Sequence, residues 1–253
     1  MFNLKNALAS GLKHISYVQA VLVVLSTMGM IYATSANLLI FNLREASVLP
    51  AGFHISHIFS ALQSDTVASL LPIIAALPYA GKYVDDVKSK FARFLIIRIG
   101  YGTYLFSRIV ICYMLSGLII LAGVACSCFV STIVFLPIEK RKTEDINLTF
   151  PLLSQCVLLL VNGGFWAMLG MTMSTVMESK YIAYASPFVA YYLLVMLCER
   201  YFPNAYLIYP HEWLNPSEKW PMGTWGVVIF LLELTALLGL VFYRRGKRRL
   251  EQL

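Results

Sequence analysis

Six blocks of mostly apolar residues, nearly free of charge, constrain the fold of this 253-residue chain more than any other feature. A helix that crosses the hydrocarbon core of a bilayer needs about 20 such residues. Hydrophobic residues make up 59% of the chain and charged ones 13%, whereas ordinary soluble domains are roughly half apolar and about a quarter charged. A water-soluble fold has too little interior for this excess, so we expect an all-α integral membrane protein with six transmembrane helices. The predicted spans are 17–41, 66–80, 103–136, 151–176, 181–199 and 224–243.

The second predicted span is short and contains Pro72 and Pro78. Proline removes a backbone donor and its ring clashes with the preceding turn, so we expect this helix to be kinked or broken. Six crossings place both ends of the chain on the same side of the membrane. We interpret residues 1–253 as a single transmembrane domain.

Residues 1–16, before the first span, have the pattern of an amphipathic helix. Leu4, Leu8, Leu12 and Ile15 recur at three-to-four spacing, while the lysines point elsewhere. Such a helix lies along the membrane surface with its apolar side in the interface. An irregular tail is the alternative.

Basic residues are distributed asymmetrically between the two predicted sides of the membrane. Cytoplasmic loops carry an excess of Lys and Arg. With the amino terminus inside, fourteen of the 20 Lys and Arg residues lie on the cytoplasmic side and six lie outside. The basic run 140–142 fits this topology least, although three nearby acids partly offset its charge. We therefore expect both termini to be cytoplasmic.

The predicted outer segment 200–223 combines aromatic side chains with four prolines. Aromatic rings with a polar edge collect at the level of the lipid headgroups. We expect an external aromatic hairpin that dips into the outer interface. Its rings are those of Tyr201, Phe202, Tyr206, Tyr209, Trp213 and Trp220.

The largest predicted cytoplasmic element is the segment 82–102, between the second and third spans. Its side chains separate onto two sides, which indicates an amphipathic helix that Gly100 and Gly102 end. A helix joined directly to two spans can transmit a movement into the bundle, so we interpret it as a coupling helix. A polybasic surface helix that only holds anionic lipid is the alternative. Val84, Val87, Phe91, Phe94 and Arg98 fall on one side, and Asp86, Lys90 and Arg93 fall largely on another.

No catalytic or nucleotide-binding motif accompanies these spans. A P-loop needs two glycines five apart, followed by Lys and Ser or Thr, so that backbone amides cradle the phosphates. The pairs Gly81-Lys82 and Gly246-Lys247 lack both the first glycine and the hydroxyl residue. We expect no cofactor, and the chain is not predicted to be an enzyme.

The cysteines and histidines do not form a predicted metal site. All five cysteines fall inside apolar blocks, which argues against a disulfide framework that staples external loops. The four histidines lie outside the predicted spans. His54 and His57 could share a helical face as metal ligands, but the sequence offers no third ligand nearby. Interfacial loop histidines are the preferred interpretation.

Glu233 is the acidic residue deepest in a predicted span. A carboxylate in lipid is costly, so an intramembrane acid is by default a functional candidate. We expect Glu233 to face the bundle interior or an interface with another membrane subunit. A structural hydrogen bond to Gln155 or Asn162 is the equally weighted alternative. Gln155, Asn162 and Glu233 are the candidates for the translocation pathway or interface.

This layout resembles the type-2 ATP-binding-cassette exporter permeases. A local run is similar too: Asp85-Asp86, Ser89-Lys90-Phe91, Arg93-Phe94-Leu95 and Arg98, followed by Tyr104 and Ser107-Arg108 at the start of the third span. Lys90 stands where that family usually has a glycine. The resemblance is strongest to the small permeases of Gram-positive bacteria that accompany a separate ATPase.

The resemblance implies a permease in a bacterial cytoplasmic membrane that pairs with a second permease and with cytoplasmic ATP-binding-cassette ATPases. Export of peptide, bacteriocin or antibiotic-like cargo is the implied function. A membrane-embedded enzyme acting on lipid or peptide, and a structural or sensory membrane protein, are the alternatives. The residues expected to bind the ATPase are Tyr83, Asp85, Asp86, Lys88, Lys90, Phe91, Arg93, Phe94 and Arg98.

Overall fold

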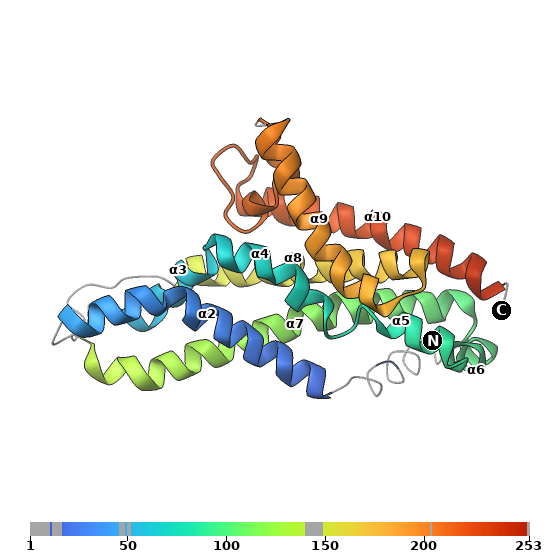
Figure 1. The fold of residues 1–253 in the computed structure, drawn as a ribbon, viewed down its shortest axis with the longest axis horizontal. Helices are drawn as coiled ribbons and strands as arrows, with labels where there is room; N and C mark the ends of the chain where they lie inside the picture. Colours follow the sequence, from blue (N-terminus) through green and yellow to red (C-terminus); the bar gives the residue numbers. More distant parts are fainter. Residues whose placement is uncertain are drawn as a thin grey trace.

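The computed structural model describes residue 11, residues 17–45, residue 49, and the ranges 52–139, 149–202 and 204–251. Helices dominate this part of the chain, and its extended structure is one isolated bridge between Leu49 and Glu139. Figure 1 shows the helices as an elongated bundle, with α9 leaning out of it at a steep angle. The predicted surface helix 1–16 falls almost wholly outside the described residues, as does the basic run 140–142.

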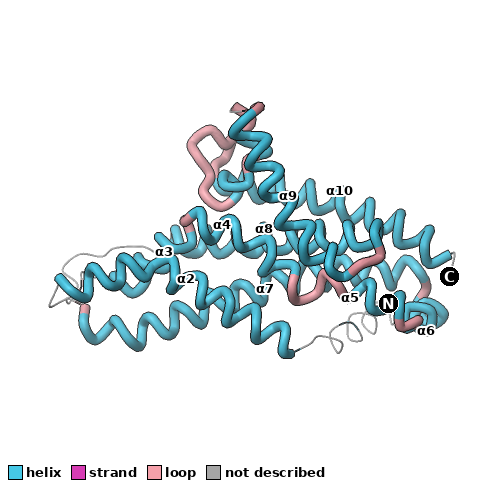
Figure 2. Tube along the Cα trace, in the orientation of Figure 1, coloured by secondary structure: helices cyan, strands magenta, loops and turns pink. Residues whose placement is uncertain are grey.

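Five helices are individually long and apolar enough to cross a membrane, which confirms the class of a multi-pass helical membrane protein. The remaining helices are short, and several of them lie at the two ends of the bundle (Figure 2). The five long helices are α2 (Tyr17–Glu45), α7 (Tyr101–Phe135), α8 (Thr149–Met177), α9 (Lys180–Arg200) and α10 (Thr224–Glu251).

The second predicted span, 66–80, overlaps α4 (Asp65–Ala76), which forms a bent pair with the helix before it, α3 (Phe53–Leu62). The two axes differ by 72°, and the count of spans reaches six only if this pair crosses as one. The bend lies between the helices, where Ser64 caps α4 by accepting a hydrogen bond from the Val67 amide at 3.3 Å. Pro72 lies inside α4. The bend therefore lies before the predicted span 66–80 and not at its prolines, because α4 continues through Pro72 and ends at Ala76, ahead of Pro78.

The segment 82–102 is not one helix, and this corrects the sequence-based expectation. It forms α5 (Lys82–Lys88) and α6 (Phe91–Ile99), separated at Lys90, whose φ is +60°. A left-handed backbone ends a helix, and it is uncommon for a residue other than glycine. Gly100, with φ +79°, ends α6, while Gly102 lies within the first turn of α7 and breaks nothing.

The core centres on α8, which packs against α4, α7, α9 and α10. Close packing in a membrane depends on small residues, since lipid tails are as apolar as the side chains they would replace. A Cβ at Gly164 would lie 2.5 Å from the Tyr113 ring, and one at Gly170 would collide with the Ala183 carbonyl oxygen. These two glycines let α7 and α9 approach α8 directly.

The aromatic hairpin folds onto the bundle. It carries the short 3-10 helices η2 (Tyr206–Ile208) and η3 (Pro210–Trp213). Trp213 is 2% exposed and its ring lies 5.6 Å from that of Trp166 on α8, while Trp220 is also buried. Both tryptophans are therefore core residues, although Tyr201 and Phe202 do remain exposed.

Candidate functional site

The candidate site lies at the end of the bundle formed by α5, α6, the first turns of α7 and α9 and the last turns of α10, here called the α5–α6 end (Figure 1). Basic residues gather there. Besides the α5–α6 residues Lys82, Lys88, Lys90, Arg93 and Arg98, this end holds Lys180 on α9 and Arg244, Arg245, Lys247, Arg248 and Arg249 on α10.

The helix α6 projects from this end with little of its surface covered. Among its residues, all of which the structure describes, Ala92 is the one that is buried. Phe94 is 69% exposed and Ile97 is 83% exposed, and the side chains of Arg93 and Arg98 are exposed beside them. An apolar surface flanked by guanidinium groups is typical of an element that binds a partner or a lipid surface.

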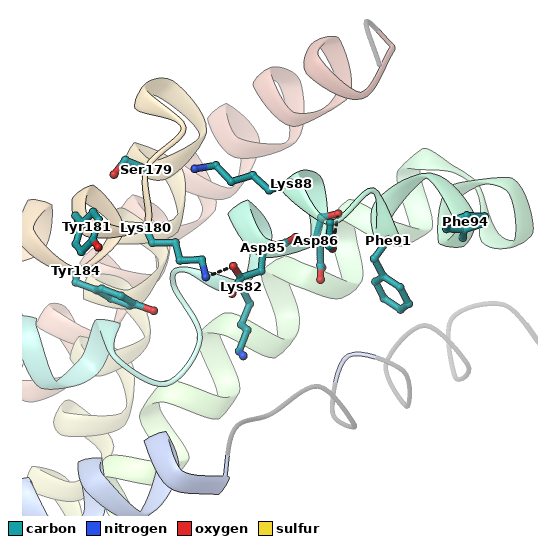
Figure 3. A pocket seen from close by; sticks show the side chains of 11 residues that line it. Lys82, Asp85, Asp86, Lys88, Phe91, Phe94, Ser179, Lys180, Tyr181 and Tyr184 are labelled. Atoms are coloured by element: carbon teal, nitrogen blue, oxygen red, sulfur yellow. Dashed lines mark hydrogen bonds and ion pairs between the residues drawn. The ribbon is translucent and has the colours of Figure 1, made fainter.

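A cleft of about 1010 Å³ separates α5 and α6 from the start of α9. Figure 3 shows Phe91 and Phe94 on one side and Tyr181 and Tyr184 on the other. An ion pair between Lys180 and Asp85 spans the cleft, and both side chains are partly exposed. The cleft is lined by Lys82, Asp85, Asp86, Lys88, Ser89, Phe91, Phe94, Ser179, Lys180, Tyr181 and Tyr184.

Behind the cleft lies a buried polar cluster that the sequence analysis missed. Arg108 on α7 is 2% exposed, and its Nη2 lies 2.5 Å from Oδ2 of Asp86 on α5. The Tyr104 hydroxyl donates to the same carboxylate oxygen at 2.9 Å, and Arg108 Nη1 donates to the hydroxyl of Tyr79. The guanidinium also lies 5.1 Å from the centroid of the Tyr104 ring, within cation–π range.

Two of the residues expected to bind an ATPase therefore lie inside the protein. Asp86 belongs to the buried cluster, and Tyr83 is fully buried with its ring 5.0 Å from that of Phe242 on α10. Loss of solvent raises the pKa of Tyr83 to about 12, so its hydroxyl stays protonated at neutral pH. The other expected residues, Asp85, Lys88, Lys90, Phe91, Arg93, Phe94 and Arg98, are exposed or partly exposed.

The three residues expected in a translocation pathway are not brought together. Gln155 is buried and its Nε2 donates to the Leu214 carbonyl at 3.0 Å, which ties α8 to the hairpin. Asn162 is 1% exposed, also on α8. Glu233 lies on the exposed side of α10 and not in the bundle interior. The expectation that Glu233 faces the bundle interior is therefore wrong. The expectation that it faces another membrane subunit stays a prediction.

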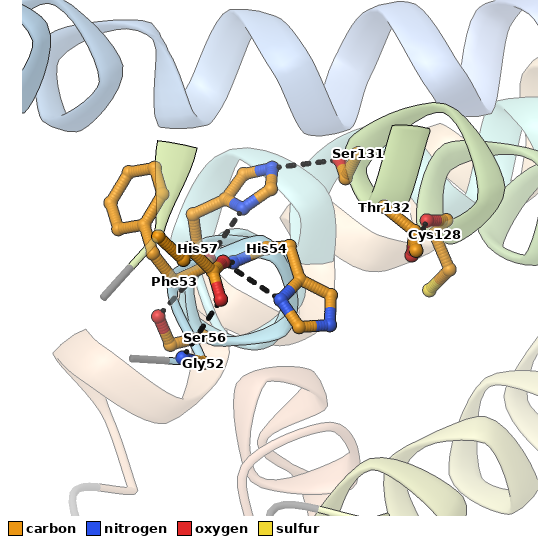
Figure 4. Close-up of polar contacts among 9 residues, drawn as sticks. Gly52, Phe53, His54, Ser56, His57, Cys128, Ser131 and Thr132 are labelled. Atoms are coloured by element: carbon orange, nitrogen blue, oxygen red, sulfur yellow. Dashed lines mark hydrogen bonds and ion pairs between the residues drawn. The ribbon is translucent and has the colours of Figure 1, made fainter. Parts of the chain in front are cut away.

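A second polar network, drawn in Figure 4, lies around the start of α3, away from the α5–α6 end of the bundle (Figure 1). Glu139 accepts hydrogen bonds from the amides of Gly52 and His54 at 3.1 and 2.6 Å, and so caps α3. Its Oε1 also lies 2.7 Å from His54 Nδ1. His57 is buried, with Nε2 3.1 Å from the Ser131 hydroxyl on α7. Both histidines are therefore helical, which corrects the expectation of loop histidines. His57 holds α3 on α7, and His54 holds it to Glu139, beyond the end of α7.

The fold and the site define a multi-pass helical membrane protein with an exposed amphipathic element at one end. Comparison with models of known protein families, with curated proteins and with solved structures found no match.

Proposed function

We propose that this chain is the membrane permease subunit of an ATP-binding-cassette exporter, and that α6 docks on a cytoplasmic ATPase. The exposed apolar surface of α6 is the observation that carries this proposal. Phe94 and Ile97 expose most of their surface at the end of the bundle where the basic residues gather. Aromatic side chains flanked by Arg are typical of interface anchors.

The position of α6 suits a mechanical role. It follows the bent pair α3–α4 through α5 and is separated from α7 by Gly100 alone. A partner that moves α6 therefore acts on two apolar segments of the bundle at once. The excess of Lys and Arg at the α5–α6 end supports a cytoplasmic orientation for this end and for the carboxyl terminus.

In this proposal the permease works with a second permease, identical or paralogous, and substrate passes between the two. Glu233 on the outside of α10 fits such an assembly, because a carboxylate facing lipid is costly and a neighbouring subunit can supply a donor. Peptide, bacteriocin or antibiotic-like cargo in a bacterial cytoplasmic membrane is the substrate class that the family resemblance suggests.

A lipid-anchoring α6 is the competing function, because its basic residues also suit anionic headgroups. The two functions depend on different side chains. An ATPase groove depends on the aromatic anchors, with the charges setting register and association rate. A lipid anchor depends chiefly on the charges.

The test is affinity purification of the full chain from its native membrane, followed by measurement of vanadate-sensitive ATP hydrolysis in the eluate. Phe91→Ala with Phe94→Ala should lower the recovered ATPase at least tenfold while the permease stays inserted and monodisperse. The matched control is Phe129→Ala with Phe202→Ala, which removes two exposed aromatics elsewhere.

Full recovery of the ATPase in the Phe91/Phe94 variant would show that α6 is not the docking element. If, in addition, replacing Lys88, Lys90 and Arg93 by Gln lowers binding to liposomes containing anionic phospholipid, α6 is a lipid anchor. Absence of ATP hydrolysis with the wild-type chain would reject the exporter function itself.

A further inference from the structure

The buried ion pair between Asp86 and Arg108 joins elements that are separate in sequence. Asp86 lies on α5, Arg108 lies two turns into α7, and Tyr79 lies in the turn between α4 and α5. Tyr104, one turn before Arg108, completes the cluster by donating to the carboxylate. The four side chains hold α5, the end of α4 and the start of α7 at one point.

Gly11 lies against the same cluster. Gly11 is buried, and a Cβ added to it would lie 3.0 Å from Arg108 Nη1 and 3.4 Å from the Tyr79 hydroxyl. Contacts this close are possible because glycine has no side chain. The backbone of Gly11 therefore covers the cluster next to Arg108 and Tyr79.

An ion pair buried so deeply is an expensive way to hold two helices together. Taking both charges out of water costs much of what their attraction returns, and apolar side chains of similar volume often stabilise a fold equally well. What the ion pair adds is a fixed geometry, because a hydrogen-bonded carboxylate and guanidinium tolerate little displacement. This suits transmission of movement better than it suits stability alone.

The neighbouring acid on α5 points the other way. Asp85 pairs with Lys180 of α9 across the cleft (Figure 3). Asp86, which is buried at the wall of the cleft, pairs instead with Arg108 on α7. Because α6 begins three residues after the end of α5, a displacement of α6 pulls on α5. The short helix α5 is thus tied to α9 across the cleft through Asp85 and to α7 through Asp86.

We propose that the Asp86–Arg108 ion pair is the link through which movement of α5 reaches α7, beside the direct connection of α6 to α7 through Gly100. The proposal rests on the proposed function, since it assigns to these residues the step that follows docking. Asp86 and Arg108 touch neither the partner nor the cargo; they are positioning residues that act through α7. Loss of this ion pair should leave docking of the ATPase intact but lower the stimulation of ATP hydrolysis by the permease.

The experiment compares Asp86→Asn alone with the double variant Asp86→Asn, Arg108→Gln. The single change leaves the guanidinium buried without its counter-charge and should lower thermal stability. The double change removes both charges; Asn keeps the shape of Asp, and Gln is shorter than Arg but keeps a polar amide, so stability should rise above that of the single variant. The link predicts that ATPase recovery stays within twofold of wild type in the double variant, while the stimulation of hydrolysis by the permease falls at least fivefold.

The matched control is Glu178→Gln, which removes another ion pair at the same end, 2.8 Å to Arg249. It should leave both recovery and stimulation unchanged. If stimulation returns together with stability in the double variant, the pair only holds the fold together and the proposed link is wrong.

A second arm needs no ATPase. Amide hydrogen exchange of the purified wild-type chain should protect residues 82–99 and 101–112 together, as one cooperative unit. In the double variant, 82–99 should exchange at least tenfold faster while 101–112 keeps its wild-type protection. Unchanged exchange in both segments would overturn the link. Separated exchange, combined with a wild-type chain that recovers no ATPase, would reject the proposed function and leave the mechanical link standing.

Discussion

The consecutive helices α8 and α9 are comparably apolar, yet they occupy opposite places in the fold. In the most apolar stretch of α8, 61% of residues are buried, against 22% in α9. Figure 1 shows α8 along the bundle and α9 leaning away from it. Apolar composition therefore predicts that each helix is a membrane span, but not which of them forms the core.

The difference follows from side-chain size and shape. In lipid, helices associate through close packing and not through the hydrophobic effect. The helix with small residues on several sides can therefore pack against several neighbours and lie at the centre. Gly163, Gly164 and Gly170 give α8 three places where another helix approaches closely. The outer side of α9 instead carries large exposed side chains such as Val189, Leu193 and Met196.

The largest effect is expected where α8 and α9 touch. Gly170→Leu places a side chain against the Ala183 backbone oxygen and the Pro187 ring, neither of which can move aside without shifting α9. We expect the variant to lose monodisperse protein on size-exclusion chromatography. Ala185→Leu, on the exposed side of α9, should behave as wild type. Normal folding of Gly170→Leu would show that glycine does not select α8 as the core.

A smaller effect is expected from truncating aromatic residues. Trp166 on α8 contacts the rings of Phe165, Tyr191 and Trp213, so Trp166→Ala leaves a cavity and should lower the free energy of unfolding by about 3 kcal/mol. Tyr192→Ala, on the exposed side of α9, should cost less than about 1 kcal/mol. Thermal unfolding in one detergent measures both, and equal losses would contradict the burial contrast between the helices.

The smallest effect is expected at Asn162 on α8. Its Oδ1 is buried without a hydrogen-bond partner among the described residues, which makes the amide unfavourable for stability. Asn162→Leu should leave the unfolding temperature unchanged or raise it by a few degrees. If Asn162 lines a translocation pathway, Asn162→Leu should lower transport without lowering the unfolding temperature. A large drop in unfolding temperature would assign Asn162 to the packed core alone.

Much of the candidate site could be anticipated from the sequence. The charged residues of the segment 82–102 predict an element outside the apolar spans, with exposed side chains. Phe94, Arg93 and Arg98 are all exposed, so side chains from both predicted sides of the segment face outward on α6. The break at Lys90 was not predicted, since left-handed backbone at a lysine has no local sequence signal. Tyr83 and Asp86 were misplaced because their burial depends on partners on other helices, Phe242 on α10 and Arg108 on α7.

The sequence by itself determined that this is a membrane protein and where its long helices lie. An apolar block of about 20 residues has few alternatives to a membrane-spanning helix. Tertiary structure alone decided which polar residues meet. Asp86 pairs with Arg108 across 22 positions, and Glu139 reaches His54 across 85. Such contacts depend on the bend between α3 and α4, on the break at Lys90 and on where glycines let helices approach. These are properties of the packed bundle, so no local periodicity encodes them.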